Sequence, residues 1–207
     1  NRILCPLRLI RHSGGGMIVP ALESVMIIVV EPTPNPRTRK FLPGSHLSSI
    51  PREFTQAARG GDPLIHALFS VPTVQTILVS EDAISVTIED EGRWSDVVPQ
   101  IRSVITEMLS PGFLSTSGDM ETEVDVDFDE ADCAVVDTIR DLIETRIRPA
   151  VASDGGDIVF RSYRDGILGL EMRGACSGCP SSATTLQSGI RGLMLHFVPE
   201  IRDVVAV

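Results

Sequence analysis

Three kinds of feature are scarce in this chain, and each shortage excludes a class of protein. Cysteine occurs 4 times in 207 residues, without the spacing of a disulfide framework, which favours a reducing compartment over secretion. Basic residues number 18 against 28 acidic ones, and they form no basic face of the kind that binds nucleic acid. No apolar run approaches the length of a membrane span. We therefore expect neither nucleic acid nor a membrane as a partner.

What the chain does have is enough apolar material for a folded core. Hydrophobic residues make up 43% of the sequence, and the mean hydropathy is +0.16. A chain of this length forms either one domain or two small ones. The sequence therefore predicts a globular protein whose partners are other proteins or metal.

The first residues differ from the rest, because positions 1–22 contain no acid but three arginines. One interpretation is the remainder of an organelle transit peptide, although the glycines after Ser13 would break an amphipathic helix. The other, which we prefer, is an upstream extension with initiation at Met17 or Met26. We treat residues 1–25 as an extension and expect Cys5 to lie outside the folded domains.

The region 26–113 has the pattern of a compact α+β domain. Met26–Val30 is an apolar run typical of a strand, and the prolines that follow forbid a helix. Asp62 before Pro63 predicts the start of a short helix. Two β-rich runs, Val74–Val79 and Ala83–Ile88, predict a hairpin. Ser95 is then the predicted N-cap of a longer helix.

Residues 114–130 are rich in Asp and Glu. Like charges at this density repel one another and extend the chain, so we predict an acidic flexible linker. A calcium loop over Asp125–Asp129 is the alternative, but it lacks the glycine of that motif and has apolar residues between the acids. We prefer the linker.

The region 131–207 predicts a second α+β domain. A helix begins near Ala131, carries apolar residues on one face and is expected to end at Pro149. Alternating strands around the turn Asp165-Gly166 predict a second hairpin. A helix in the 180s and a last strand over Ile201–Val207 complete the domain. The predicted fold is thus two small α+β domains, each an antiparallel or mixed sheet with helices packed on it.

Two cysteines lie two residues apart directly after this hairpin, in the run Gly174-Ala175-Cys176-Ser177-Gly178-Cys179-Pro180. Pro180 suits the first position of a helix, where its missing N–H costs nothing. Both thiols would then lie near a helix N-terminus, whose dipole favours the thiolate that binds metal. The pattern predicts metal or redox chemistry at Cys176 and Cys179.

Two thiolates are half of a four-thiolate site, and the chain has no second pair. We therefore hypothesise a homodimer in which each subunit contributes Cys176 and Cys179, as a cubane iron-sulfur cluster requires. Zinc bridging two chains would use the same ligands. A thioredoxin-like dithiol oxidoreductase is a further alternative, although it predicts a parallel βαβ unit before the pair. Cys133 is expected to be a small buried residue and is not counted as a ligand.

Together these motifs resemble the Nfu family of iron-sulfur cluster scaffold and carrier proteins. The second half is similar to the NifU C-terminal domain through Asp154-Gly155-Gly156-Asp157, the cysteine run and Val198-Pro199-Glu200. The first half is similar to the Nfu N-terminal domain through Thr33-Pro34-Asn35-Pro36 and Lys40-Phe41-Leu42-Pro43-Gly44. No role is assigned to residues 45–61.

The resemblance implies that Cys176 and Cys179 ligate one 4Fe-4S cluster per homodimer. It also implies that upstream assembly proteins donate the cluster, that apo iron-sulfur proteins accept it, and that the first domain aids partner recognition. No catalytic constellation is visible, so we expect a protein that is not an enzyme. For the compartment we expect a bacterial cytoplasm, with the mitochondrial matrix as the alternative.

Overall fold

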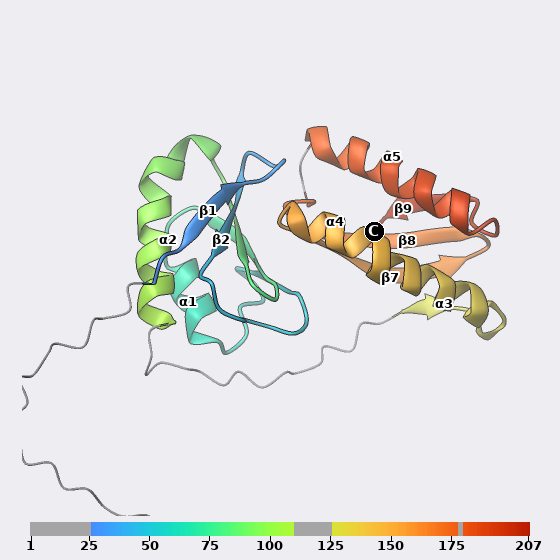
Figure 1. Cartoon of the computed structure of the whole chain (residues 1–207), viewed down its shortest axis with the longest axis horizontal. Coiled ribbons are helices and arrows are strands. Elements are labelled where there is room, and N and C mark those ends of the chain that lie inside the picture. The colour runs from blue at the N-terminus through green and yellow to red at the C-terminus, as the bar shows by residue number, and fades with distance from the viewer. Residues whose placement is uncertain (1–25, 110–125, 178–179) are drawn as a thin grey trace, which may run out of the picture.

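The computed structural model describes residues 26–109, 126–177 and 180–207, with the side chains of 180–187 excepted. Two sheets, each with its own helices, make up the described parts of the chain (Figure 1). The predicted α+β class with two small domains is confirmed. The predicted domain boundaries remain predictions, and most of the predicted linker lies outside the described residues.

The first domain is built on a fully antiparallel sheet. Its strands are β1 (Val29–Pro32), β2 (Thr38–Leu42), β3 (Arg52–Thr55), β4 (Val74–Val79) and β5 (Ile84–Ile88), in the spatial order β1-β2-β5-β4-β3. The β4–β5 hairpin is confirmed. The first strand begins later than predicted, because its pairing with β2 starts at Val29 opposite Leu42, just before Pro43, which has no N–H to donate.

Two helices, α1 (Pro63–Phe69) and α2 (Trp94–Met108), pack on one face of this sheet. Asp62 caps α1 as predicted, since its carboxylate accepts a hydrogen bond from the N–H of Leu64 at 2.8 Å. Ser95 does not cap α2, so that prediction was wrong. The chain instead enters α2 through a 3-10 turn capped by Asp90, which accepts from the N–H of Gly92 at 2.9 Å.

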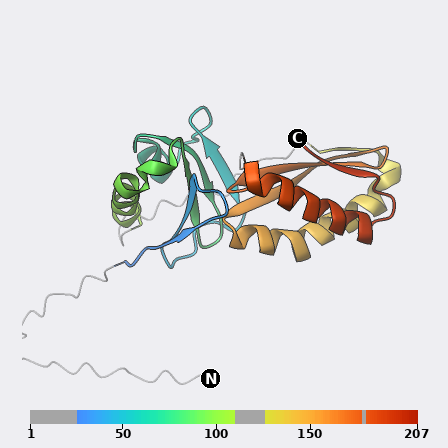
Figure 2. The ribbon, with the colours of Figure 1, turned by 90° about the horizontal axis from the view of Figure 1, so that it is seen from above.

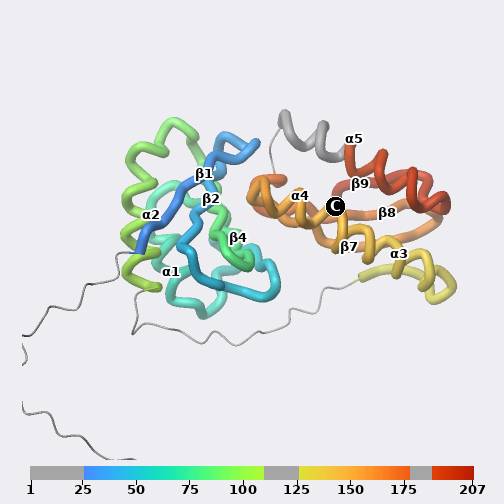
Figure 3. Tube along the Cα trace, in the orientation of Figure 1, coloured from blue at the N-terminus to red at the C-terminus, as the bar shows by residue number. Residues whose placement is uncertain are grey.

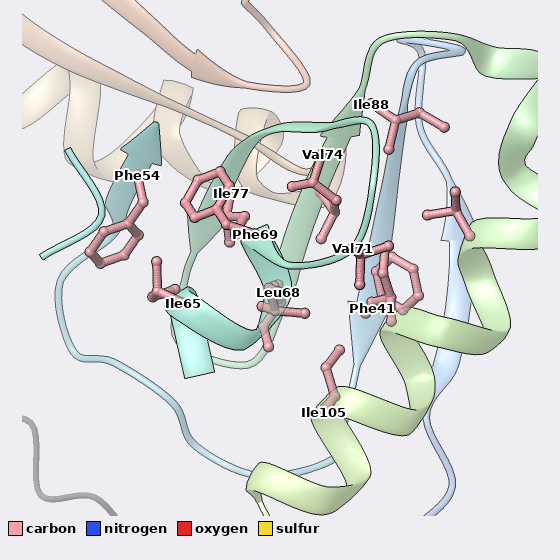
Figure 4. Close-up of a cluster of buried hydrophobic side chains, with 14 of the residues drawn as sticks. Phe41, Phe54, Ile65, Leu68, Phe69, Val71, Val74, Ile77, Ile88 and Ile105 are labelled. Carbon is pink, nitrogen blue, oxygen red and sulfur yellow. The ribbon is translucent and has the colours of Figure 1, made fainter. Parts of the chain in front are cut away.

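The core of the first domain lies between the sheet and these helices (Figure 4). It is entirely apolar, and the side chains come from every layer: Phe41, Phe54, Ile65, Leu68, Phe69, Val71, Val74, Ile77, Ile88 and Ile105 are drawn. Burying such side chains contributes about 1.5–3 kcal/mol each. The helices and the sheet are therefore held together without any buried ion pair in this cluster.

The second domain has a mixed sheet with helices on one face only (Figure 2). Its strands are β6 (Asp127–Phe128), β7 (Gly156–Arg164), β8 (Ile167–Gly174) and β9 (Asp203–Ala206), in the order β6-β7-β8-β9. The helices are α3 (Cys133–Leu142), α4 (Arg148–Ser153) and α5 (Pro180–Phe197). The predicted β7–β8 hairpin turns at Asp165 and Gly166, both with positive φ.

Pro149 does not end the first helix of this domain as predicted. A π-helical turn over Ile143–Ile147 joins α3 to α4, and Pro149 lies in the first turn of α4. A wide π turn interrupts the regular hydrogen-bond ladder ahead of the proline, whose missing N–H is tolerated in a first turn. The helical path therefore continues to Ser153.

Strand β6 lies inside the range predicted as linker. The guanidinium of Arg164 forms ion pairs with Asp127 of this strand and, at 2.8 Å, with Asp129 just after it. The arginine holds the pKa of the Asp127 carboxyl below its usual range. Two of the acids in the alternative calcium loop are therefore occupied by an arginine.

The helices of the first domain lie on the side away from the second domain, so the opposite face of the first sheet is turned toward it (Figures 1 and 2). The Cα trace shows the ends of β7 and β8 nearest this face (Figure 3). Of the helices in the described ranges, none is long and apolar enough to cross a membrane.

Candidate functional site

Cys176 lies in the turn between β8, which ends at Gly174, and α5, which begins at Pro180. Gly174 makes this turn possible because its φ is +61°, a value that side chains disfavour. The N–H of Ser177 donates to the carbonyl of Gly174 at 3.0 Å, and that of Cys176 donates to the carbonyl of Arg173 at 3.3 Å. The backbone of this segment is thus fixed on both sides of the cysteine.

The side chain of Cys176 points into the second domain. It is 5% exposed and belongs to the buried cluster between the sheet and the helices. A Cβ placed on Gly156 would collide with the Cys176 sulfur. Gly156, at the start of β7, therefore leaves the space that this thiol occupies.

The glycine pair in Asp154-Gly155-Gly156-Asp157 consequently has two functions. Gly155 serves the turn between α4 and β7, since its φ is +78°, a value that side chains disfavour. Gly156 instead serves packing against Cys176. No feature of the sequence signals this second function, because the two residues are far apart along the chain.

The other cysteines stand as follows. Cys179 and Cys5 lie outside the described residues, so the structure does not place the second thiol of the pair, and its function as a ligand remains a prediction. Cys133 was predicted to be buried but is exposed. It is the first residue of α3, ahead of Val136, the first side chain of that helix in the core. Within the described ranges, no three His, Cys, Asp or Glu side chains are grouped to hold a metal ion.

A partly buried ion pair stabilises the strand beside the cysteine. Asp157 on β7 is 2% exposed, and its carboxylate accepts a hydrogen bond from Arg148 Nε at 3.0 Å. Arg148 also donates to the carbonyl of Ile158 at 3.1 Å. Burial raises the pKa of Asp157, and the positive charge of Arg148 opposes that shift. The pair joins the start of α4 to the start of β7.

Charged side chains line the face of β7 and β8 that the helices leave uncovered. Glu171 accepts from Arg173 Nε at 2.8 Å and also pairs with Arg161. Burial opposes ionisation of Glu171, yet the hydrogen bonds from the two arginines outweigh it and hold its pKa below the usual range. The carboxylate is therefore negative at neutral pH.

The first domain also reaches the cysteine turn. Glu53 of β3 accepts a hydrogen bond from the N–H of Gly174 at 2.8 Å, and the Asn35 amide donates to the carbonyl of Ser177 at 3.2 Å. Burial raises the pKa of Glu53, and the bond from Gly174 opposes that shift. Sequence analysis gave neither residue a function, and Glu53 lies in the segment 45–61 that was left unassigned.

The element that precedes the cysteines bears on the choice between a metal-binding protein and a thioredoxin-like oxidoreductase. A thioredoxin-like protein would have a parallel βαβ unit before the pair. Here the preceding element is the β7–β8 hairpin, which is antiparallel. The surroundings of Cys176 thus differ from those that the oxidoreductase alternative requires.

Both halves of the chain match known family models. Residues 28–112 match the model described as "Scaffold protein Nfu/NifU N terminal", and residues 139–205 match the "NifU-like domain". The chain belongs to the Nfu/NifU family. The resemblance drawn from the motifs is thereby confirmed for both domains of this Nfu-type protein.

Among curated relatives, the "NFU1 iron-sulfur cluster scaffold homolog, mitochondrial" of Drosophila willistoni is 36% identical over 185 residues. The match covers 88% of this chain and 64% of that relative. The protein of the same name from Drosophila ananassae is 36% identical over 182 residues, covering 86% and 63%. The chain thus spans less than two thirds of the length of these relatives.

Among solved structures, a NifU-like protein from Saccharomyces cerevisiae is 19% identical. The match covers 48% of this chain and 88% of that protein, with a TM-score of 0.39.

The names of the Drosophila relatives overturn one prediction. These proteins are named as mitochondrial, so the expectation of a bacterial cytoplasm was wrong; the composition that suggested a reducing compartment does not distinguish the two locations.

Proposed function

We propose that this protein holds a 4Fe-4S cluster between two copies of the chain, through Cys176 and Cys179 of each, and passes it to other proteins. The observation that carries the proposal is the position of Cys176. It lies in the short segment between β8 and α5 of the domain that matches the NifU-like model. The proposal is also supported by the relatives, which are named as iron-sulfur cluster scaffold homologues.

The ligand chemistry supports the same reading. Thiolates are soft ligands that suit iron-sulfur clusters, and a cubane uses four of them. One chain offers two cysteines at ligand spacing, so a second copy is the simplest source of the other two.

A site shared by two chains also explains how the cluster could be released to another protein. If two chains hold it, loss of the cluster and dissociation of the dimer are linked by mass action. Such a cluster can leave when an acceptor competes for it. We infer that assembly proteins act as donors, that apo iron-sulfur proteins act as acceptors, and that the protein catalyses no reaction. From the names of the relatives we place it in mitochondria.

The test is anaerobic reconstitution with iron and sulfide on the full chain and on three single variants. Cys176→Ser and Cys179→Ser should each lose the cluster and stay monomeric, since two thiolates then remain per pair of chains. Cys133→Ser is the matched control, because Cys133 is exposed on α3, and it should bind as much iron as the wild type. Full iron and sulfide in either of the first two variants would contradict the proposal.

The same experiment separates the alternatives. A colourless dimer that takes up zinc and loses it in both cysteine variants would indicate a zinc-bridged dimer. A protein without metal that cycles a disulfide between Cys176 and Cys179 would indicate a dithiol oxidoreductase. Each result would replace the cluster in the proposed function.

A further inference from the structure

One face of the first domain's sheet is buried although it lies outside that domain's core. Leu78 on β4 is 2% exposed, but it belongs to neither of the two hydrophobic clusters. Its neighbours Ile77 and Val79 in the strand pack on the helix side. Ser85 and Thr87 of β5 are buried as well. A layer other than the helices therefore covers this face.

That layer is the cysteine end of the second domain. A Cβ on Gly174 would lie 2.6 Å from Leu78 Cδ2, and one on Gly155 would lie 3.0 Å from Ser85 Oγ. Both glycines thus lie where the second domain approaches the first too closely for a side chain. Figure 2 shows the ends of the orange strands against the sheet of the first domain. We call this contact the docking contact.

Polar bonds in the docking contact enclose Cys176 on both sides. Glu53 accepts from the N–H of Gly174 at 2.8 Å, two residues before the cysteine. Asn35 donates to the carbonyl of Ser177 at 3.2 Å, one residue after it. Lys40 donates to the carbonyl of Ser153 at 3.3 Å and ties down α4 as well. The first domain thereby fixes the backbone that carries the thiol.

In the conformation that it fixes, the thiol points into the core of the second domain. Cys176 is 5% exposed and its sulfur faces Gly156. A thiolate binds iron or zinc only by direct contact, at about 2.3 Å for zinc. A sulfur enclosed in one domain cannot reach a metal that another chain shares. The turn must therefore change its conformation before Cys176 can ligate.

We propose that the first domain is a latch: while docked it keeps Cys176 buried, and undocking makes the thiol available to a cluster. Leu78, Glu53 and Asn35 act as positioning residues. This inference rests on the proposed function for the identity of the cargo, but the burial of Cys176 can be measured without any metal.

The composition of the docking contact suits a latch that opens. Its apolar part centres on Leu78, and Glu53 must bury a carboxylate to accept the bond from Gly174. Burial raises the pKa of that group because the charged form is disfavoured there. Interfaces between domains of one chain are typically small enough for the domains to move. Docking and release can thus exchange under native conditions.

The test is pulsed alkylation of the full-length protein without metal, with the rate at each cysteine read by peptide mass spectrometry. In the wild type Cys176 should react far more slowly than the exposed Cys133, which serves as the internal reference. Leu78→Asp replaces the apolar centre of the contact with a charge beside Glu53. It should speed labelling of Cys176 by about tenfold or more, given the apolar area lost, and leave Cys133 unchanged.

Two further variants sharpen the result. Gln75→Asp puts the same charge at an exposed site on the same strand and should label as the wild type does. Glu53→Gln keeps an oxygen that can accept from the N–H of Gly174 but has no charge to bury. Alkylation of Cys176 in this variant should therefore be as slow as in the wild type or slower. Emission of Trp94, the single tryptophan, verifies that the first domain of each variant is folded.

Equal labelling of Cys176 and Cys133 in the wild type would overturn the latch, as would unchanged labelling in a folded Leu78→Asp variant. These outcomes are independent of the cargo. Loss of the latch with normal cluster binding would leave the proposed function intact. A confirmed latch on a protein that binds no iron would overturn the proposed function alone.

Discussion

The two domains share a plan, a small sheet with helices on one face, but they fill their interiors differently. The first has a cluster made only of apolar side chains. The second includes Cys176 and Tyr163 in its cluster and places the pair of Arg148 and Asp157 at the cysteine end. Such polar groups need specific partners when buried. The buried polar side chains of the first domain, Asn35, Thr38, Ser85 and Thr87, are uncharged, whereas the second domain buries the ionisable groups of Asp157, Tyr163 and Cys176.

The chain contains one spectroscopic probe in each domain, so the unfolding of the two domains can be followed separately. The chain has 1 tryptophan and 1 tyrosine. Trp94 lies in the core of the first domain and Tyr163 in that of the second. Fluorescence of the tryptophan and absorbance of the tyrosine therefore report the unfolding of each domain. The predictions below use both.

The largest effect is expected in the apolar first domain. Leu68 is fully buried, and Leu68→Ala should lower the free energy of unfolding by about 3 kcal/mol through lost burial and a cavity. The Trp94 transition should move to lower denaturant while the Tyr163 transition stays. Leu64→Ala, on the same helix but only half-buried, is the control and should cost less. Equal shifts in both transitions would mean that the domains unfold as one unit.

Removal of Arg148 should act on the second domain. Arg148→Ala leaves the Asp157 carboxylate buried without its partner and should cost about 2 kcal/mol, less than a fully buried pair because Arg148 is partly exposed. The Tyr163 transition should shift and the Trp94 transition should not. Arg148→Lys keeps the charge but not the fork that also reaches the carbonyl of Ile158, so it should recover only part of the loss.

Two glycine-to-alanine substitutions in the second domain should change its free energy of unfolding in opposite directions. Gly156→Ala places a methyl group against the Cys176 sulfur and should cost about 1–2 kcal/mol by overpacking. Gly189→Ala in α5 meets nothing within 4 Å and should gain about 0.5–1 kcal/mol, because alanine favours a helix. Chemical denaturation followed by Tyr163 measures both. A neutral Gly156→Ala would contradict the packing of Cys176 described here.

The smallest effect concerns pH. Because burial raises the pKa of Asp157 in the folded protein, the folded state holds its proton more strongly than the unfolded state does. The stability from this group is present below about pH 4, its unfolded pKa, and is lost as the pH rises through the folded pKa. Asp157→Asn should flatten this part of the pH dependence of the Tyr163 transition. If the free energy of unfolding of the second domain instead rose with pH as Asp157 ionises, the direction of this prediction would be wrong.

The sequence predicted the parts of the fold that depend on neighbouring residues. The cap of α1 by Asp62 and the turn at Asp165 and Gly166 follow from a few adjacent side chains. Strands β2 and β3 were missed because their burial is set by partner strands far along the chain. The effect of Pro149 was misjudged for a similar reason, since a π turn upstream accommodates it.

The candidate site shows the same division. The position of Cys176 before a helix could be predicted from Pro180 and the preceding hairpin. Its burial against Gly156 could not, because nothing local fixes which way a cysteine side chain points. Glu53 and Asn35 reach the cysteine turn from the other domain, and no spacing in the sequence encodes a contact of that kind.

The most direct measurement is the iron, sulfide and mass of the full chain after anaerobic reconstitution. A cubane held by the thiolates of two chains predicts four irons and four sulfides per pair of chains, in a particle of twice the monomer mass. Iron bound to a monomer, or a dimer that forms equally well without Cys176, would contradict the assignment of the shared cluster to this cysteine.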